Sequence, residues 1–110
     1  MRQYLIDELR AEDNEKLKEY FEKNFKTSAM EGIYWIPLDD HILDITQKEH
    51  HDCKPFFFAV ELSSNALGCE LLIRSQQTIR CDCLAFANKA QRDWLIETID
   101  SIFEKLGIIF

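Results

Sequence analysis

The chain has 110 residues, of which 46% are hydrophobic and 30% are charged, a composition typical of one globular domain rather than of a disordered segment. Thirteen Lys and Arg against twenty Asp and Glu give a net charge of −7, which repels phosphate backbones and anionic lipids, so neither nucleic acid nor a membrane is an expected partner. The charged residues within the first ten positions argue against a signal peptide, and no apolar run approaches the roughly 20 residues that span a bilayer. We therefore expect a cytoplasmic protein whose cysteines are reduced.

The N-terminal part of the chain predicts one helix. Residues 4–9 form a short apolar stretch that suits either a strand or an irregular lead-in, and the pattern is too brief to choose. From Ala11 to about Phe25 the apolar residues follow helical spacing, and acidic residues lie near the positive end of the helix dipole. The acids of this helix alternate with basic residues, which is typical of a solvated face. Residues 26–32 are polar and small, so we expect a loop there.

A strand and a short helix are expected next. The string IYWIPL is rich in aromatic and β-branched residues and predicts a strand, but Pro37 lacks an N–H donor and so indicates an edge position or the end of the strand. Thr46 and Glu49 match a capping box, which predicts a short helix through about Cys53. Pro55 prevents that helix from continuing.

Residues 55–87 predict three consecutive antiparallel strands, because apolar residues recur at every second position. The inner face is expected to carry Phe56, Phe58, Val60, Leu62, Cys69, Leu71, Ile73, Ile79, Cys81, Cys83 and Ala85. The outer face is expected to carry charged residues interrupted by apolar ones: Glu61, Glu70, Arg74, Arg80 and Asp82 with Phe57, Ala59, Leu72, Leu84 and Phe86.

The register of the last two strands is limited by the rule that directly opposite residues share a face. A three-residue connection satisfies this rule with the pairs Ile73 with Ile79, Leu71 with Cys81, and Cys69 with Cys83. The same register sets Glu70 opposite Asp82, and this like-charge pair counts against it.

The C-terminal part predicts a long amphipathic helix. Asn88 and Gln91 have the spacing of an N-terminal cap, and Gly107 is placed to end the helix. The apolar stripe of this helix consists of Trp94, Leu95, Thr98, Ile99, Ile102, Phe103 and Leu106. Residues 108–110 are apolar and are expected to pack or to contact a partner.

The predicted order of elements is α-β-α-β-β-β-α. It indicates a single α+β domain over residues 1–110, a two-layer sandwich in which helices pack a mostly antiparallel four-stranded sheet. The strings GIYWIP, RCDCLAFA and QRDWLI, in this order, resemble a group of small uncharacterised bacterial proteins with no assigned activity. That resemblance implies a compact bacterial α+β domain and carries over no site residues.

Cysteines form the most conspicuous candidate site. Cys81 and Cys83 on a strand would point the same way about 7 Å apart, and a metal could bridge them. A zinc site could be completed by Cys69 together with a ligand from the short helix, which would be Cys53, His50 or His51. The preferred interpretation is that the thiols fill the inner face beneath a helix, so no metal or other cofactor is expected.

Histidines and aromatic residues offer weaker candidates. His41 lies among three aspartates and His50 beside His51, but exposed positions explain both more simply. Tyr34, Trp35, Trp94 and the eight Phe residues could line an apolar pocket, although core packing accounts for them as well. The chain has no phosphate-binding glycine loop and no nucleophile-elbow motif.

The preferred function is a non-catalytic module that binds another protein or a second copy of itself. Its expected contact surface is the outer sheet face with Phe57, Leu72, Arg74, Arg80, Leu84 and Phe86. Alternatively, the N-terminal helix covers this face through Leu17, Tyr20 and Phe21. Two other functions stay open: a metal-binding or thiol-redox protein using Cys81, Cys83 and Cys69, and a small enzyme using His41 or His50.

Overall fold

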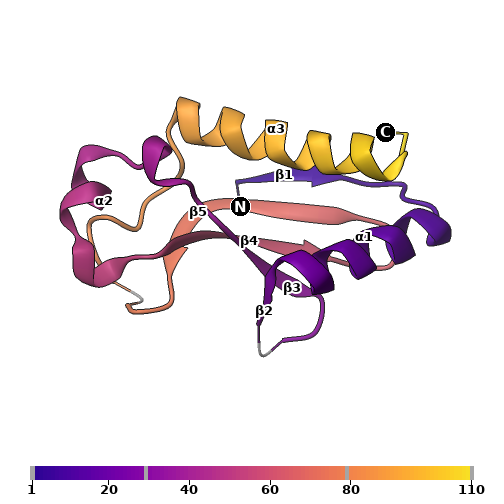
Figure 1. Cartoon of the computed structure of the whole chain (residues 1–110), viewed down its shortest axis with the longest axis horizontal. Coiled ribbons are helices and arrows are strands. Elements are labelled where there is room, and N and C mark those ends of the chain that lie inside the picture. The colour runs from indigo at the N-terminus through magenta and orange to yellow at the C-terminus, as the bar shows by residue number, and fades with distance from the viewer. Residues whose placement is uncertain (1, 29, 79, 110) are drawn as a thin grey trace.

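The computed structural model describes residues 2–28, 30–78 and 80–109. It is an α+β structure with a five-stranded antiparallel sheet and three α-helices (Figure 1). In chain order the elements are β1 (Gln3–Ile6), α1 (Ala11–Asn24), β2 (Lys26–Thr27), β3 (Ile33–Pro37), the 3₁₀ turn η1 (Asp40–Ile42), α2 (Ile45–Glu49), the 3₁₀ turn η2 (His51–Cys53), β4 (Phe56–Leu62), β5 (Leu67–Ser75) and α3 (Lys89–Leu106).

The strand order in the sheet is β1-β5-β4-β3-β2, and every neighbouring pair is antiparallel. The predicted strands over β3, β4 and β5 are confirmed, and β3 ends at Pro37 as its missing donor requires. The expected loop after α1 contains the two-residue strand β2, and the undecided stretch near the N-terminus contains β1. The sheet therefore has five strands rather than the four expected.

The third strand predicted for residues 79–87 is wrong. Within its described residues only the isolated bridge between Leu72 and Phe86 joins it to β5. The register was also wrong, because β1 occupies the edge of β5 and sets Tyr4, not Cys83, opposite Cys69. Leu71 donates to Arg2 and not to Cys81, and Ile79 lies outside the described residues.

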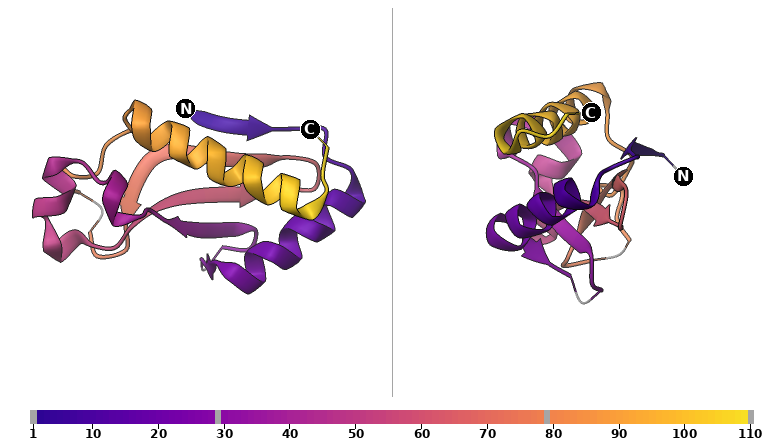
Figure 2. Two further views of the ribbon diagram at one scale, coloured as in Figure 1. Left: turned by 45° about the horizontal axis from the view of Figure 1, so that its top comes forward. Right: turned by 90° about the vertical axis from the view of Figure 1, so that its right-hand side faces the viewer.

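Both long helices lie on the same side of the sheet (Figure 2). Phe21 of α1 packs on Tyr34 of β3 with ring centroids 5.3 Å apart, and Trp94 of α3 stacks on Phe58 of β4 at 6.2 Å. The inner face that they cover carries fully buried residues such as Phe58, and each large apolar side chain so buried contributes roughly 1.5 to 3 kcal/mol. The alternative that α1 covers the outer face is therefore wrong.

The long helix α3 begins and ends as predicted. The Asn88 side chain accepts from the Gln91 N–H while the Gln91 side chain accepts from the Asn88 N–H, a complete capping box. Gly107 closes the helix in the left-handed conformation with φ 72°, which costs glycine little. Of the apolar tail, Ile108 is buried and Ile109 is 90% exposed, whereas Phe110 lies outside the described residues.

The short helix α2 begins earlier than predicted. Its capping box pairs Asp44 with Gln47, not Thr46 with Glu49, because Asp44 is the residue in extended conformation at the helix start. The helix ends at Glu49, and the η2 turn continues to Cys53. Together with η1, these elements form one end of the molecule (Figure 1), where the candidate site lies.

Candidate metal centre

Two hydrogen-bonded turns supply the side chains of the candidate site. In the first, the Cys53 N–H donates to the His50 carbonyl at 3.1 Å, which closes a 3₁₀ turn. Residues three apart in such a turn are aligned one above the other, so His50 and Cys53 project from the same side. The H-x-x-C spacing therefore allows both side chains to bind the same ion.

The second turn contains the two remaining cysteines. The Leu84 N–H donates to the Cys81 carbonyl at 3.0 Å, so residues 81–84 form a turn and not the extended strand that was expected. In a strand the two thiols would stand about 7 Å apart. The turn folds Cys81 and Cys83 closer together.

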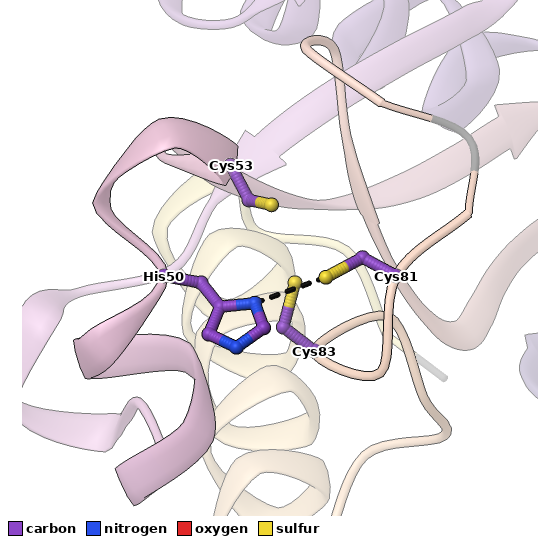
Figure 3. A group of neighbouring side chains, drawn as sticks. All are labelled: His50, Cys53, Cys81 and Cys83. Carbon is purple, nitrogen blue, oxygen red and sulfur yellow. Dashed lines mark hydrogen bonds between the residues drawn. The ribbon is translucent and has the colours of Figure 1, made fainter.

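Four ligand atoms converge where the two turns meet (Figure 3). These are a ring nitrogen of His50 and the sulfurs of Cys53, Cys81 and Cys83, all within 4.8 Å of one another. Zinc–sulfur bonds near 2.3 Å and zinc–nitrogen bonds near 2.0 Å place the corners of a tetrahedron about 3.6 to 3.8 Å apart. Side-chain shifts on the order of 1 Å would therefore complete a tetrahedral Cys₃His site.

Contacts within the cluster make Cys81 its most acidic thiol. The pKa of Cys81 is lowered to about 7 by hydrogen bonds from the Cys83 N–H and thiol, with smaller contributions from His50 and Cys53. The Nδ1 atom of His50 lies 2.9 Å from the Cys81 sulfur. Burial and the neighbouring thiols raise the pKa of Cys83 to about 12. Cys81 therefore loses its proton more readily than Cys83 does when no cation is bound.

A chain of buried amide contacts holds the two turns in place. Gln47 donates to the Cys83 carbonyl at 3.1 Å, and its own side-chain oxygen accepts from Gln91 at 2.8 Å. Gln91 also donates to the Ile42 carbonyl at 3.0 Å. Both glutamines are 1% exposed and both belong to the capping boxes of their helices, so the starts of α2 and α3 fix the backbone at Cys83.

The cluster lies near the surface. Cys83 is buried, whereas His50, Cys53 and Cys81 are half-buried. Residues 49–53 line an open hollow of about 450 Å³ beside it. A cation can therefore reach the ligand atoms from solvent, because Cys83 alone of these four residues is buried.

Other residues named from the sequence lie apart from this cluster. Cys69 is fully buried on β5, where burial and then the charge of Asp100 raise its thiol pKa to about 12; the cluster's fourth ligand is Cys53. His51 is exposed. His41 is also exposed, and the Asp39 carboxylate that lies 3.8 Å from its imidazole is exposed as well.

Of the six residues expected to form a contact surface, four are paired in the sheet: Phe57 is opposite Arg74, and Leu72 is bridged to Phe86. Phe57 is only 6% exposed and packs edge-on against Trp35, while Leu84 packs against the hydrophobic core. Arg74 forms an ion pair with Glu70, and Arg80 is exposed in the segment after β5. Leu72 is half-buried, and Phe86 is 45% exposed.

Comparison with known proteins adds no assignment. No protein-family model, curated protein or solved structure matches the chain significantly. The resemblance to small bacterial proteins stays a prediction. Within the described part of the chain, no helix has both the length and the apolarity needed to cross a membrane.

Proposed function

We propose that the protein binds one zinc ion through His50, Cys53, Cys81 and Cys83, and that this ion has a structural role. The observation that supports the proposal is the convergence of four N and S ligand atoms within 4.8 Å from two turns far apart in the sequence. Three thiolates and an imidazole form a donor set that zinc prefers. Four protein ligands also fill a tetrahedral site and leave no position for a substrate, which favours a structural over a catalytic ion.

The bound ion would fasten the η2 turn to the segment that follows β5. Residues 81–84 lie outside the regular elements and the segment joins β5 by an isolated bridge, so few backbone contacts hold it. Binding of an ion to the folded chain alone adds RT ln(1 + [L]/Kd) to its stability, about 4 kcal/mol at a thousandfold excess over Kd. We expect the glutamine contacts to keep the metal-free chain folded, with a lower melting temperature.

Metal analysis of purified variants tests this proposal. Wild-type protein reconstituted with zinc and then desalted should retain one ion per chain, and chelation should lower its melting temperature. Cys53→Ser and Cys81→Ser should each lose most of the metal, because each removes a thiolate that a hydroxyl replaces poorly. Cobalt(II) in the wild-type site should give the visible bands of tetrahedral thiolate coordination.

Cys69→Ala provides the matched control, since this thiol is buried away from the cluster. It should lose some stability through its cavity yet keep the full metal content. A folded wild-type chain that retains no zinc after reconstitution would exclude the proposed function. Equal metal content in Cys81→Ser and wild type would exclude the ligand set.

A second candidate function is contact with another protein or a second copy through the outer sheet face. A hollow of about 220 Å³ lies there, with Ile33, Ala59 and Gly68 in its lining, and the Trp35 ring nearby is half-buried. Ile33→Lys would place a charge on this face without entering the inner core. If the face forms a contact, the variant should lose an associated state that light scattering detects in wild type.

A further inference from the structure

The three thiols of the candidate metal centre differ in how solvent reaches them. Cys53 and Cys81 are half-buried, whereas Cys83 is only 1% exposed. Cys53 is also part of the lining of the open hollow of about 450 Å³ beside the centre. A small oxidant can therefore reach Cys53 and Cys81 from solvent, whereas the protein covers Cys83.

Contacts that involve no metal hold the two accessible thiols near each other. The Ser75 hydroxyl, at the end of β5, donates to the Cys53 carbonyl. The Cys81 carbonyl accepts from the Leu84 N–H at 3.0 Å, and the thiols of Cys53 and Cys81 share a hydrogen bond. Their sulfurs lie within 4.8 Å of each other, so a side-chain movement of about 2 Å brings them to the length of a disulfide bond.

We propose that hydrogen peroxide oxidises Cys53 and Cys81 to a disulfide, and that this reaction releases the zinc ion. The inference rests on the proposed function, because it concerns the thiolates that hold the ion. A sulfur in a disulfide is no longer a thiolate and binds zinc poorly. Only His50 and Cys83 then remain as ligands, which is half of the tetrahedral set.

The atoms and electrons of this reaction balance with peroxide as the oxidant. One thiolate attacks a peroxide oxygen, breaks the O–O bond and expels hydroxide, which leaves a sulfenic acid. The second thiolate attacks that sulfur, forms the S–S bond and expels a second hydroxide. Two electrons pass from the sulfurs to the peroxide oxygens, and zinc leaves as Zn²⁺ with its charge unchanged.

The alternative disulfide, between Cys81 and Cys83, is disfavoured. Cys83 is buried, and both residues belong to one turn, so their bond would close a very short loop. The Cys53–Cys81 bond instead joins the η2 turn to the segment after β5, the same two segments that the ion fastens. A cross-link over this longer loop restricts the unfolded chain more. The oxidised chain should therefore melt at a higher temperature than the reduced, metal-free chain.

Peroxide treatment of the zinc-reconstituted chain tests the inference. A zinc-binding dye should detect the release of one ion per chain, while the free thiols counted in denatured protein fall from four to two. Peptide mass spectrometry should identify the Cys53–Cys81 link, and dithiothreitol with added zinc should restore the starting state. Cys69→Ala is the control and should release its zinc to the same extent.

The metal-free Cys83→Ser variant separates the disulfide from the ion. It should still form the Cys53–Cys81 bond, because Cys83 takes no part in it. Zinc retained at a peroxide concentration that oxidises the metal-free wild type would overturn this inference alone. So would zinc release without a disulfide, or with one that contains Cys83. A folded wild type that binds no zinc would overturn the proposed function together with this inference.

Discussion

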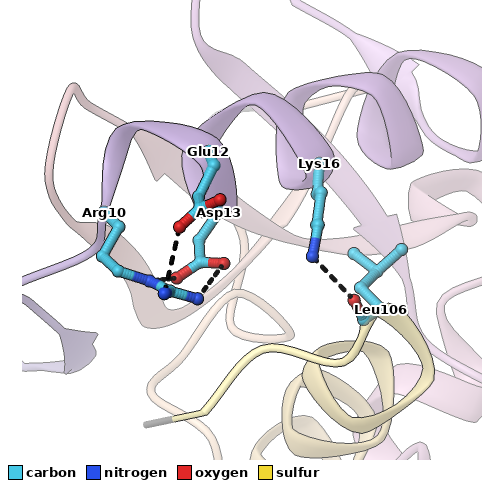
Figure 4. Close-up of polar contacts among 5 residues, drawn as sticks. All are labelled: Arg10, Glu12, Asp13, Lys16 and Leu106. Carbon is cyan, nitrogen blue, oxygen red and sulfur yellow. Dashed lines mark hydrogen bonds and ion pairs between the residues drawn. The ribbon is translucent and has the colours of Figure 1, made fainter.

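At the scale of single residues, the start of α1 depends on Asp13. Arg10 is the N-cap residue but makes no side-chain cap bond; instead its guanidinium donates to the Asp13 carboxylate at 2.9 and 3.2 Å (Figure 4). The Asp13 side chain is almost fully covered, whereas Arg10 and Glu12 remain more than half exposed. A carboxylate in the first turn also interacts favourably with the helix dipole.

The pH dependence of stability should report this contact. The Arg10 hydrogen bond holds the pKa of Asp13 below its usual range, so the folded chain favours the ionised form. This stabilisation is present above the unfolded-state pKa near 4 and is lost as the pH falls through the lower folded-state pKa. Asp13→Asn should lower the free energy of unfolding at pH 7 and flatten its decline below about pH 4.

Urea unfolding at pH 7 and at pH 3 measures that effect. Glu12→Gln is the control, because this exposed carboxylate contacts the same guanidinium at 3.0 Å but should contribute little. If Asp13→Asn retained the wild-type difference between the two pH values, the contact would not be responsible for it.

At the scale of elements, α3 carries the largest share of the helical core. Its residues Leu95, Ile99 and Phe103 are fully buried, while Trp94 lies at the margin of the stripe and is half-buried. The apolar stripe is therefore predicted on the correct face of α3, but its residues are buried to different extents. Lys16 of α1 donates to the carbonyl of Leu106 at 3.5 Å and places a cation at the negative end of this helix (Figure 4).

Alanine substitutions along α3 should follow this difference in depth. Phe103→Ala removes a fully buried ring and should cost about 3 to 5 kcal/mol of unfolding free energy. Trp94→Ala should cost less, because part of its ring already contacts solvent, although it loses the stack on Phe58. Thermal or urea unfolding measures both, and a larger loss for Trp94→Ala would show that the helix is rotated from its described position.

At the scale of the whole molecule, a hydrogen bond connects the N-terminal strand to the C-terminal helix. The Tyr4 hydroxyl on β1 donates to the Asp100 carboxylate on α3 at 2.6 Å. Burial first, and then this bond to Asp100, raise the pKa of the Tyr4 hydroxyl. The contact fixes the N-terminal strand beneath the C-terminal helix.

Tyr4→Phe should destabilise the chain by about 1 kcal/mol, because it removes the hydroxyl and leaves Asp100 half-buried without that donor. Tyr20→Phe is a matched control, since Tyr20 is also half-buried and its hydroxyl makes no hydrogen bond among the described residues. Equal melting temperatures for Tyr4→Phe and Tyr20→Phe would contradict a stabilising role for the Asp100 contact.

Local patterns in the sequence were sufficient for the long elements. The helical stripe and the Asn88 cap predicted α3, Pro37 predicted the end of β3, and alternation predicted β4 and β5. These features depend on neighbouring residues whose side chains share one face or one turn, so the sequence alone determines them.

Tertiary structure decided where the remaining segments lie. Alternation made residues 79–87 suitable for a strand, but β1, from the other end of the chain, occupies most of the edge of β5 that such a strand would need. The sequence offered Cys53 and His50 as alternative ligands for Cys81, Cys83 and Cys69, whereas the structure brings both of them to Cys81 and Cys83 and leaves Cys69 apart. Both outcomes depend on contacts between segments far apart in the chain. Local spacing does not encode which distant segment occupies a given position.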